Sequence, residues 1–88
     1  MSKNTTIWKF ALNNGRLVIP KGAKLLTVQD QHGETQLWAE VDPNAPKVER
    51  RLAIIGTGWA DGVIDDGVYL GTFQSGPMVF HVYDLGEA

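Results

Sequence analysis

Residues Lys24–Val41 read KLLTVQDQHGETQLWAEV, two apolar, β-favouring runs with a short polar segment between them. The runs are Lys24–Asp30 and Thr35–Val41, and the segment Gln31–Glu34 contains the glycine that is typical of a hairpin turn. This stretch therefore predicts an antiparallel hairpin.

Turn signals recur on both sides of this hairpin. Ser75–Pro77 separates the runs Val68–Gln74 and Met78–Asp84, which predicts a second hairpin. Asn13–Gly15 is typical of a reverse turn, and Asp42–Pro46 must be a loop because each of its two prolines lacks a backbone donor. No segment has a convincing helical pattern. The spacing predicts an all-β fold, a small antiparallel sandwich or barrel of roughly six to seven strands.

Length and composition favour a small soluble protein. The 88 residues suit one domain, residues 1–88, with a core small enough that we expect protomers to share surface in a homo-oligomer. The chain has no cysteine, which excludes disulfides and thiolate metal sites. Its first residues lack the apolar segment of a signal peptide, and no apolar run has the length of a membrane helix. We expect a cytoplasmic protein with no membrane partner.

The charges are divided along the chain. Residues 1–24 contain five lysines and arginines and no acid, whereas residues 52–88 contain five acids and no lysine or arginine. One explanation is that the N- and C-terminal strands lie side by side. The other is a basic face for an anionic partner. The net charge of -2 argues against binding to duplex DNA, which usually requires a strongly basic domain.

Arg50 and Arg51 are adjacent in the strand-like run Lys47–Thr57. Period-two alternation directs the two side chains to opposite faces, so only one of them can reach a given pocket. An arginine on the core side either packs its stem at the rim and pairs with a carboxylate, or binds a ligand carboxylate or phosphate through two hydrogen bonds. Both alternatives remain open from the sequence.

The run ends in Gly56-Thr57-Gly58-Trp59, which is a candidate ligand-binding loop. The glycines allow close backbone approach, Thr57 offers a hydroxyl and Trp59 a stacking face. The alternative is a bend that ends the strand, with Trp59 folded over the edge of the core. Trp38 and His81 are further candidates for ligand contact, each with a packing role as the alternative.

Catalysis and metal binding have little support in the sequence. The neighbouring acids Asp65 and Asp66 lie in a glycine-bounded loop that would position them poorly as a catalytic pair. His32 and His81 are distant in sequence and form no metal-ligand cluster. We therefore expect no enzyme activity, no catalytic residue, no metal and no cofactor.

Several short motifs together resemble a family of small bacteriophage and prophage proteins that contain a domain of unknown function. The resemblance covers nearly the whole chain and rests on Ile7–Phe10, Pro20–Lys24, Leu37–Ala39, Val41–Pro43, Arg50-Arg51, Gly56–Gly58, Gly71–Gln74 and Val79–Val82. The family carries no assigned chemistry, so it implies no catalytic residue. A histidine commonly follows its Gly-Thr-Gly element, and Trp59 stands there in this chain.

Two functions of different classes follow from the residues and this resemblance. The first is a phage anti-defence protein in the host cytoplasm that sequesters a small anionic, nucleotide-like ligand. Its site would contain Arg50 or Arg51, the Thr57–Trp59 loop, Trp38 and His81. The second is a protein that inhibits a host factor, or an accessory phage structural protein, acting through a sheet edge and exposed tryptophans.

Overall fold

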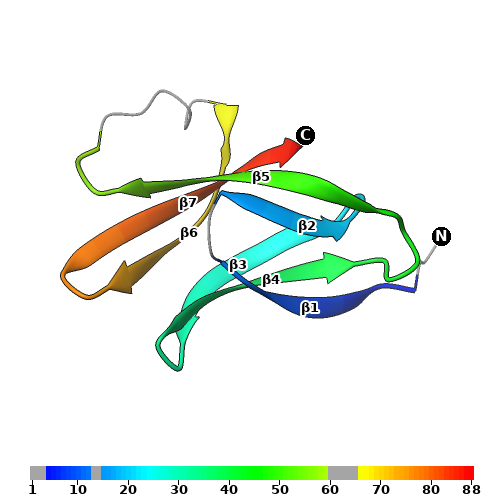
Figure 1. The fold of residues 1–88 in the computed structure, drawn as a ribbon, viewed down its shortest axis with the longest axis horizontal. Coiled ribbons are helices and arrows are strands. Elements are labelled where there is room, and N and C mark those ends of the chain that lie inside the picture. The colour runs from blue at the N-terminus through cyan, green and yellow to red at the C-terminus, as the bar shows by residue number, and fades with distance from the viewer. Residues whose placement is uncertain (1–3, 13–14, 60–65) are drawn as a thin grey trace.

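A computed structural model describes residues 4–12, 15–59 and 66–88. Their strands form two antiparallel sheets that are not closed into a barrel, which confirms the all-β prediction with seven strands and, of its two alternatives, the sandwich rather than the barrel (Figure 1). The strands are β1 (Thr6–Ala11), β2 (Arg16–Pro20), β3 (Lys24–Gln31), β4 (Glu34–Val41), β5 (Lys47–Gly56), β6 (Val68–Ser75) and β7 (Met78–Glu87). One sheet has the order β1-β4-β3 and the other β2-β5-β7-β6. None of the described residues form a helix with the length and hydrophobicity that a membrane crossing needs.

Both predicted hairpin turns are confirmed. Between β3 and β4, His32 and Gly33 have φ angles of 54° and 82°, the two positive values that a type I′ turn requires. Between β6 and β7, Gly76 has a φ of 58° and precedes Pro77, as in a type II′ turn with glycine at its first central position. Both turns match the right-handed twist of their strands and fix the strand register.

The core lies between the two sheets and follows the alternation of the strands. On β4, Leu37, Ala39 and Val41 are at most 1% exposed, and they face buried residues of the second sheet. At one side of the sandwich β3 lies against β6, where Gly71 leaves room for the buried side chain of Val28. The buried core residues are Leu17, Ile19, Ala23, Val28, Leu37, Ala39, Val41, Leu52 and Val82.

Each of three strands contains a bulge in which one leucine has no partner in the strand register. These residues are Leu26 in β3, Leu70 in β6 and Leu85 in β7. A bulge adds one residue to the period-two alternation, so residues three apart on either side of it share a face. The bulge in β6 thereby places Tyr69 and Thr72 on one face, and the bulge in β7 does the same for Asp84 and Glu87.

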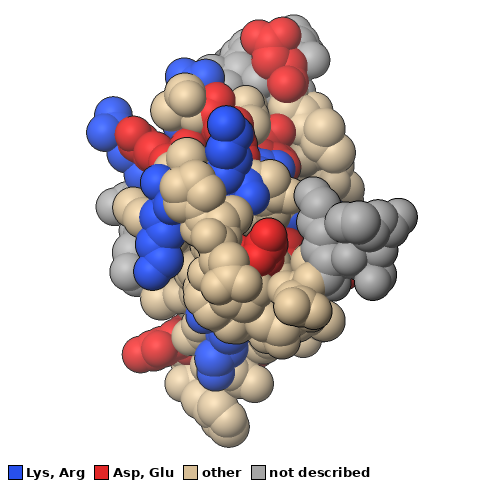
Figure 2. All heavy atoms as spheres, turned by 90° about the vertical axis from the view of Figure 1, so that its right-hand side faces the viewer, with Lys and Arg blue, Asp and Glu red and all other residues tan. Residues whose placement is uncertain are grey.

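The prediction that the N- and C-terminal strands lie side by side is wrong. β1 pairs with β4 in the three-stranded sheet, whereas β7 lies between β5 and β6 in the other. The turn predicted at Asn13–Gly15 includes two residues outside the described ranges, and the strands on either side of it belong to different sheets. At the end of the sandwich on the right of Figure 1, basic and acidic side chains are interleaved rather than separated (Figure 2).

Candidate functional site

Arg50 faces the inside of the sandwich, because its partner in the register is the buried Leu17 of β2. Its Nε donates to Oδ1 of Asp84 at 3.0 Å and its Nη2 donates to Oδ2 at 2.7 Å, a two-bond contact with one carboxylate. Its Nη1 donates to the Ala23 carbonyl at 2.9 Å and lies 4.0 Å from Oε2 of Glu87. We call these four residues the Arg50 cluster.

The Arg50 cluster is a charged pair held away from solvent. The Arg50 and Asp84 side chains are only 13% and 16% exposed. Burial by itself would raise the pKa of the Asp84 carboxyl, but hydrogen bonds from Arg50 and the Gly86 N–H outweigh it and lower that pKa. The hydrogen bond to Asp84 also raises the pKa of Arg50. The guanidinium is engaged within the protein, so the geometry matches the structural alternative for this arginine.

Arg51 points away from the core on the same strand, as alternation predicts. It is exposed and lies opposite Arg16 of β2 in the register. Arg16 is paired with Glu49, whereas no described residue forms a hydrogen bond or ion pair with the Arg51 side chain. Arg16 and Arg51 together outnumber the one acid between them, Glu49, so an anion beside Arg51 would offset the remaining positive charge.

A chain of hydrogen bonds, which we call the hydroxyl relay, crosses the outer face of the same sheet from β6 to the end of β5. The Tyr69 hydroxyl lies 2.5 Å from Thr72 Oγ1, which lies 3.0 Å from Nδ1 of His81. The His81 Nε2 lies 2.8 Å from Thr57 Oγ1, and Thr57 donates to the Val79 carbonyl at 3.2 Å. The register explains the central contacts, because Thr72 is the direct cross-strand partner of His81.

Only one arrangement of hydrogens satisfies every contact of the relay when His81 is neutral. A carbonyl can only accept, so the Thr57 hydrogen points to Val79, and the contact between Thr57 and His81 must use a hydrogen on Nε2. The bare Nδ1 then accepts from Thr72, which in turn accepts from Tyr69. Four hydrogens serve four contacts, and His81 is a donor toward Thr57 rather than a base.

A hollow of about 200 Å³ lies beside the relay and is called here the Thr57 hollow. This volume is below the usual range for small-molecule pockets, about 300–1,000 Å³, so it suits one ring of a ligand rather than a whole molecule. Its lining consists of apolar, aromatic and hydroxyl-bearing groups from β5, the following turn and β7. The lining residues are Ile55, Gly56, Thr57, Gly58, Trp59, His81 and Tyr83.

The Gly56–Trp59 turn forms one wall of the Thr57 hollow. The Trp59 N–H donates to the Gly56 carbonyl at 3.0 Å, and Gly58 has a φ of 88°, the positive value that the third position of a type II turn requires. The Trp59 ring lies over Gly56 and meets Phe80 edge-on at 5.9 Å, yet it stays 55% exposed. Trp59 thus folds over the edge of the core and still presents surface to solvent.

The structure brings together three of the six residues predicted from the sequence, Thr57, Trp59 and His81. Arg51 shares the sheet face of Thr57 and His81, whereas the Trp59 ring lies over Gly56 and against Phe80, which alternate to the opposite face. The Arg51 Cα lies about 13 Å along β5 from that of Ile55, at a strand rise of about 3.3 Å per residue. Trp38 lies on the outer face of the other sheet, between Lys9 and Thr27, with the core separating it from the hollow.

Sequence reasoning missed Tyr69 and Thr72. Alternation alone places residues three apart on opposite faces, and the bulge at Leu70 reverses that expectation. Tyr83 could have been predicted from the sequence, because alternation places it on the same face as His81. The Tyr69 and Tyr83 rings meet edge-on at 5.6 Å, which joins the relay to the wall of the hollow.

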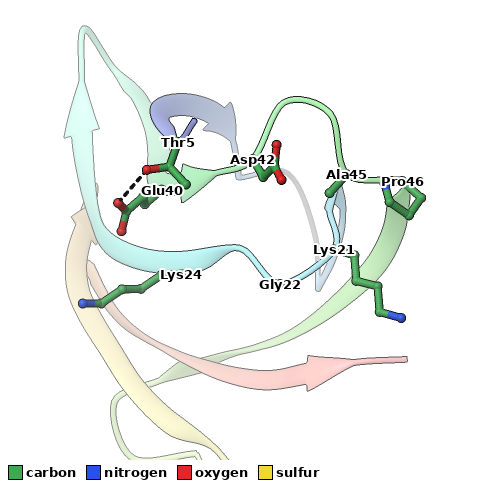
Figure 3. A pocket seen from close by; sticks show the side chains of 8 residues that line it. All are labelled: Thr5, Lys21, Gly22, Lys24, Glu40, Asp42, Ala45 and Pro46. Atoms are coloured by element: carbon green, nitrogen blue, oxygen red, sulfur yellow. Dashed lines mark hydrogen bonds between the residues drawn. The ribbon is translucent and has the colours of Figure 1, made fainter. Parts of the chain in front are cut away.

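A larger hollow of about 570 Å³ lies at the loop end of the sandwich. In Figure 3 the Lys21 and Lys24 side chains extend away from one another, and Glu40 accepts a hydrogen bond from Thr5 at 3.1 Å. The Asp42 carboxylate accepts from the Asn44 N–H and so shapes the loop. The charged groups therefore do not converge on one point, and the Thr57 hollow is the better candidate site.

No curated protein and no solved structure shows significant similarity to this chain. One family model matches residues 3–88, a range that includes every strand of both sheets. The chain therefore belongs to the family described as domain of unknown function DUF7352.

Proposed function

We propose that this chain is a small ligand-binding protein and that its site is the outer face of the four-stranded sheet, from the Thr57 hollow to Arg51. The ligand is a small anion that carries a planar ring, of the nucleotide class. The hydroxyl relay beside the hollow is the observation that carries this proposal. An exposed sheet face needs no such chain, because water can satisfy each hydroxyl separately. A relay with every hydrogen engaged holds its side chains in one arrangement before a ligand arrives.

The surrounding groups support a ring at one end of the site and a charge at the other. Trp59 and Tyr83 both line the hollow, which is too small for a whole nucleotide, and Tyr83 offers aromatic surface on the same face as His81. Arg51 is exposed on the same face and has no partner among the described residues. A guanidinium in this condition can form a bidentate contact with a phosphate without first breaking an ion pair.

We further propose that the protein retains its ligand rather than converting it. A distance of 2.8 Å between Thr57 and His81 is within the range of a nucleophile and its base. In the relay, however, His81 donates to Thr57 and the Thr57 hydrogen is held by the Val79 carbonyl, so His81 is not placed to remove it. Sequestration of a nucleotide-like signal in a host cytoplasm, as a phage anti-defence protein, extends this proposal and rests on the sequence resemblance.

The alternative, inhibition of a host protein through exposed apolar surface, has weaker support. Of the exposed apolar side chains outside the candidate site, Ile7 and Leu26 lie on the three-stranded sheet and Val18, Val68 and Met78 on the four-stranded sheet, so they are divided between two sheets.

Calorimetric titration with adenosine 5′-monophosphate tests the proposal, with Arg51→Met and Lys47→Met as matched variants. Both residues are exposed, and alternation places them on the same face of β5, but Lys47 lies four residues farther from the hollow. A hydrogen bond to a charged group contributes about 1.5–3 kcal/mol, so Arg51→Met should weaken binding by roughly 10- to 150-fold. Lys47→Met should leave it within about twofold. Equal effects of the two variants, or no binding at millimolar concentration, would refute the proposed site.

A further inference from the structure

The oxygens that the hydroxyl relay presents to solvent have no hydrogen left to donate. Tyr69 is 56% exposed, and its hydrogen is used toward Thr72. Thr57 lines the hollow, and its hydrogen is used toward Val79. Each oxygen keeps lone-pair capacity, since a hydroxyl can accept two hydrogen bonds and each accepts at most one within the relay.

We infer that the site selects a ligand ring that carries a hydrogen-bond donor, specifically an exocyclic amino group, over the same ring without one. This inference rests on the proposed function and names the ring chemistry that the same site takes. A ring nitrogen or carbonyl placed against Tyr69 or Thr57 would bring two lone pairs together, whereas an N–H would meet an acceptor. Among nucleotides, an amino-bearing base is therefore preferred.

Three other features support the direction of the hydrogen bonds in the relay. The Val79 carbonyl that sets the direction also accepts the Thr57 N–H at 3.0 Å, so the backbone holds it in place. Among the described residues, the lining of the hollow contains no lysine, arginine, aspartate or glutamate; Tyr83, whose hydroxyl is outside the relay, also lines it. The Tyr69 ring packs edge-on against Tyr83, which limits movement of its oxygen away from Thr72.

The ligand test compares adenosine 5′-monophosphate with purine riboside 5′-monophosphate, which differ only in the exocyclic amino group. A hydrogen bond between neutral groups contributes little net free energy, so we expect the amino compound to bind about 2- to 10-fold more tightly. Tyr69→Phe keeps the ring against Tyr83, and Thr57→Val keeps the shape of its side chain. At least one of these variants should bring the two affinities together.

The outcomes separate this inference from the proposed function. If the two compounds bind equally and Arg51→Met weakens both, the selection is overturned while the proposed site stands. A preference that survives in both Tyr69→Phe and Thr57→Val also overturns it. If neither compound binds, the proposed function fails and the inference fails with it.

A second measurement tests the relay without any ligand. Nitrogen-15 spectra of the imidazole distinguish the two neutral tautomers of histidine. We expect His81 to carry its hydrogen on Nε2 at a pH where the ring is neutral. A hydrogen on Nδ1 would reverse the contacts at Thr72 and Tyr69 and would overturn the inference directly.

Discussion

Replacing Arg50 with methionine should destabilise the fold strongly, while the same change at its neighbour Arg51 should not. Arg50→Met keeps most of the apolar stem but removes two hydrogen bonds to Asp84 and one to the Ala23 carbonyl. The Asp84 carboxylate is then left partly buried with the Gly86 N–H as its remaining donor among the described residues. Arg51 is exposed and has no such partners.

The structure sets the size of the effect. Breaking a buried ion pair by removing one partner costs about 3–5 kcal/mol. Because Arg50 and Asp84 keep 13% and 16% exposure, water can replace part of the lost contact, so we expect the lower end, about 3 kcal/mol. A domain of 60–100 residues loses about 4–8 °C of Tm per kcal/mol, which gives a fall of roughly 12–24 °C. Arg51→Met should change stability by about 0.5 kcal/mol or less.

Urea unfolding followed by tryptophan fluorescence and thermal melts followed by circular dichroism measure both variants. The double variant Arg50→Met/Asp84→Leu provides the control, because it also removes the unpaired Asp84 carboxylate and should recover much of the lost stability. Equal melting temperatures for Arg50→Met and Arg51→Met would refute the structural role given to Arg50. A double variant no more stable than Arg50→Met would place the loss in packing rather than in the charge pair.

Three further predictions concern the dependence of Tm on pH in acid and two glycines, Gly56 and Gly71, that lie very close to other side chains. The pKa of Asp84 is lowered in the folded state, so its ionised form stabilises the protein above its ordinary value of 3.8, and this contribution is lost as the pH falls below it. Asp84→Asn should flatten the dependence of Tm on pH in that range, and an unchanged slope would contradict the assignment. A Cβ at Gly56 would lie 2.5 Å from Trp59 Cε2, so Gly56→Ala should displace the indole and change its fluorescence. The variant should lose more free energy of nucleotide binding than of folding. A Cβ at Gly71 would lie 2.9 Å from Cγ2 of the buried Val28, so Gly71→Ala should cost about 1–3 kcal/mol by overpacking, and Gly71→Ala combined with Val28→Ala should be less destabilised than the sum of the single variants.

The features that the sequence predicted correctly are those determined by a few neighbouring residues. The two hairpin turns follow from glycines that adopt positive φ between β-favouring runs. The opposite orientations of Arg50 and Arg51 follow from alternation within one strand. The position of Trp38 opposite the inward-facing Leu37 and Ala39 follows in the same way.

The features that could not be predicted from the sequence depend on which strands pair. Local patterns place Trp38 on an outer face, but only the sheet order shows that this face belongs to the other sheet from His81. The predicted pairing of the terminal strands is wrong for the same reason, since the division of charge along a chain carries no information about strand order. The carboxylate partner of Arg50 is 34 residues away along the chain, and no local signal identifies Asp84 among the acids of the C-terminal half.

The bulge at Leu70 makes the candidate site depend on the backbone geometry of β6 as well as on its side chains. Deleting this one residue would restore simple alternation and leave Tyr69 and Thr72 two positions apart, still on one face of the sheet. The relay would lose its exposed end if β6 kept Leu70 but ran without the bulge, because Tyr69 and Thr72 would then point to opposite sides of the sheet. In a comparison of family members, the spacing between this tyrosine and threonine must therefore be considered together with the bulge, and two chains with the same tyrosine, threonine and histidine can differ in whether they build the site.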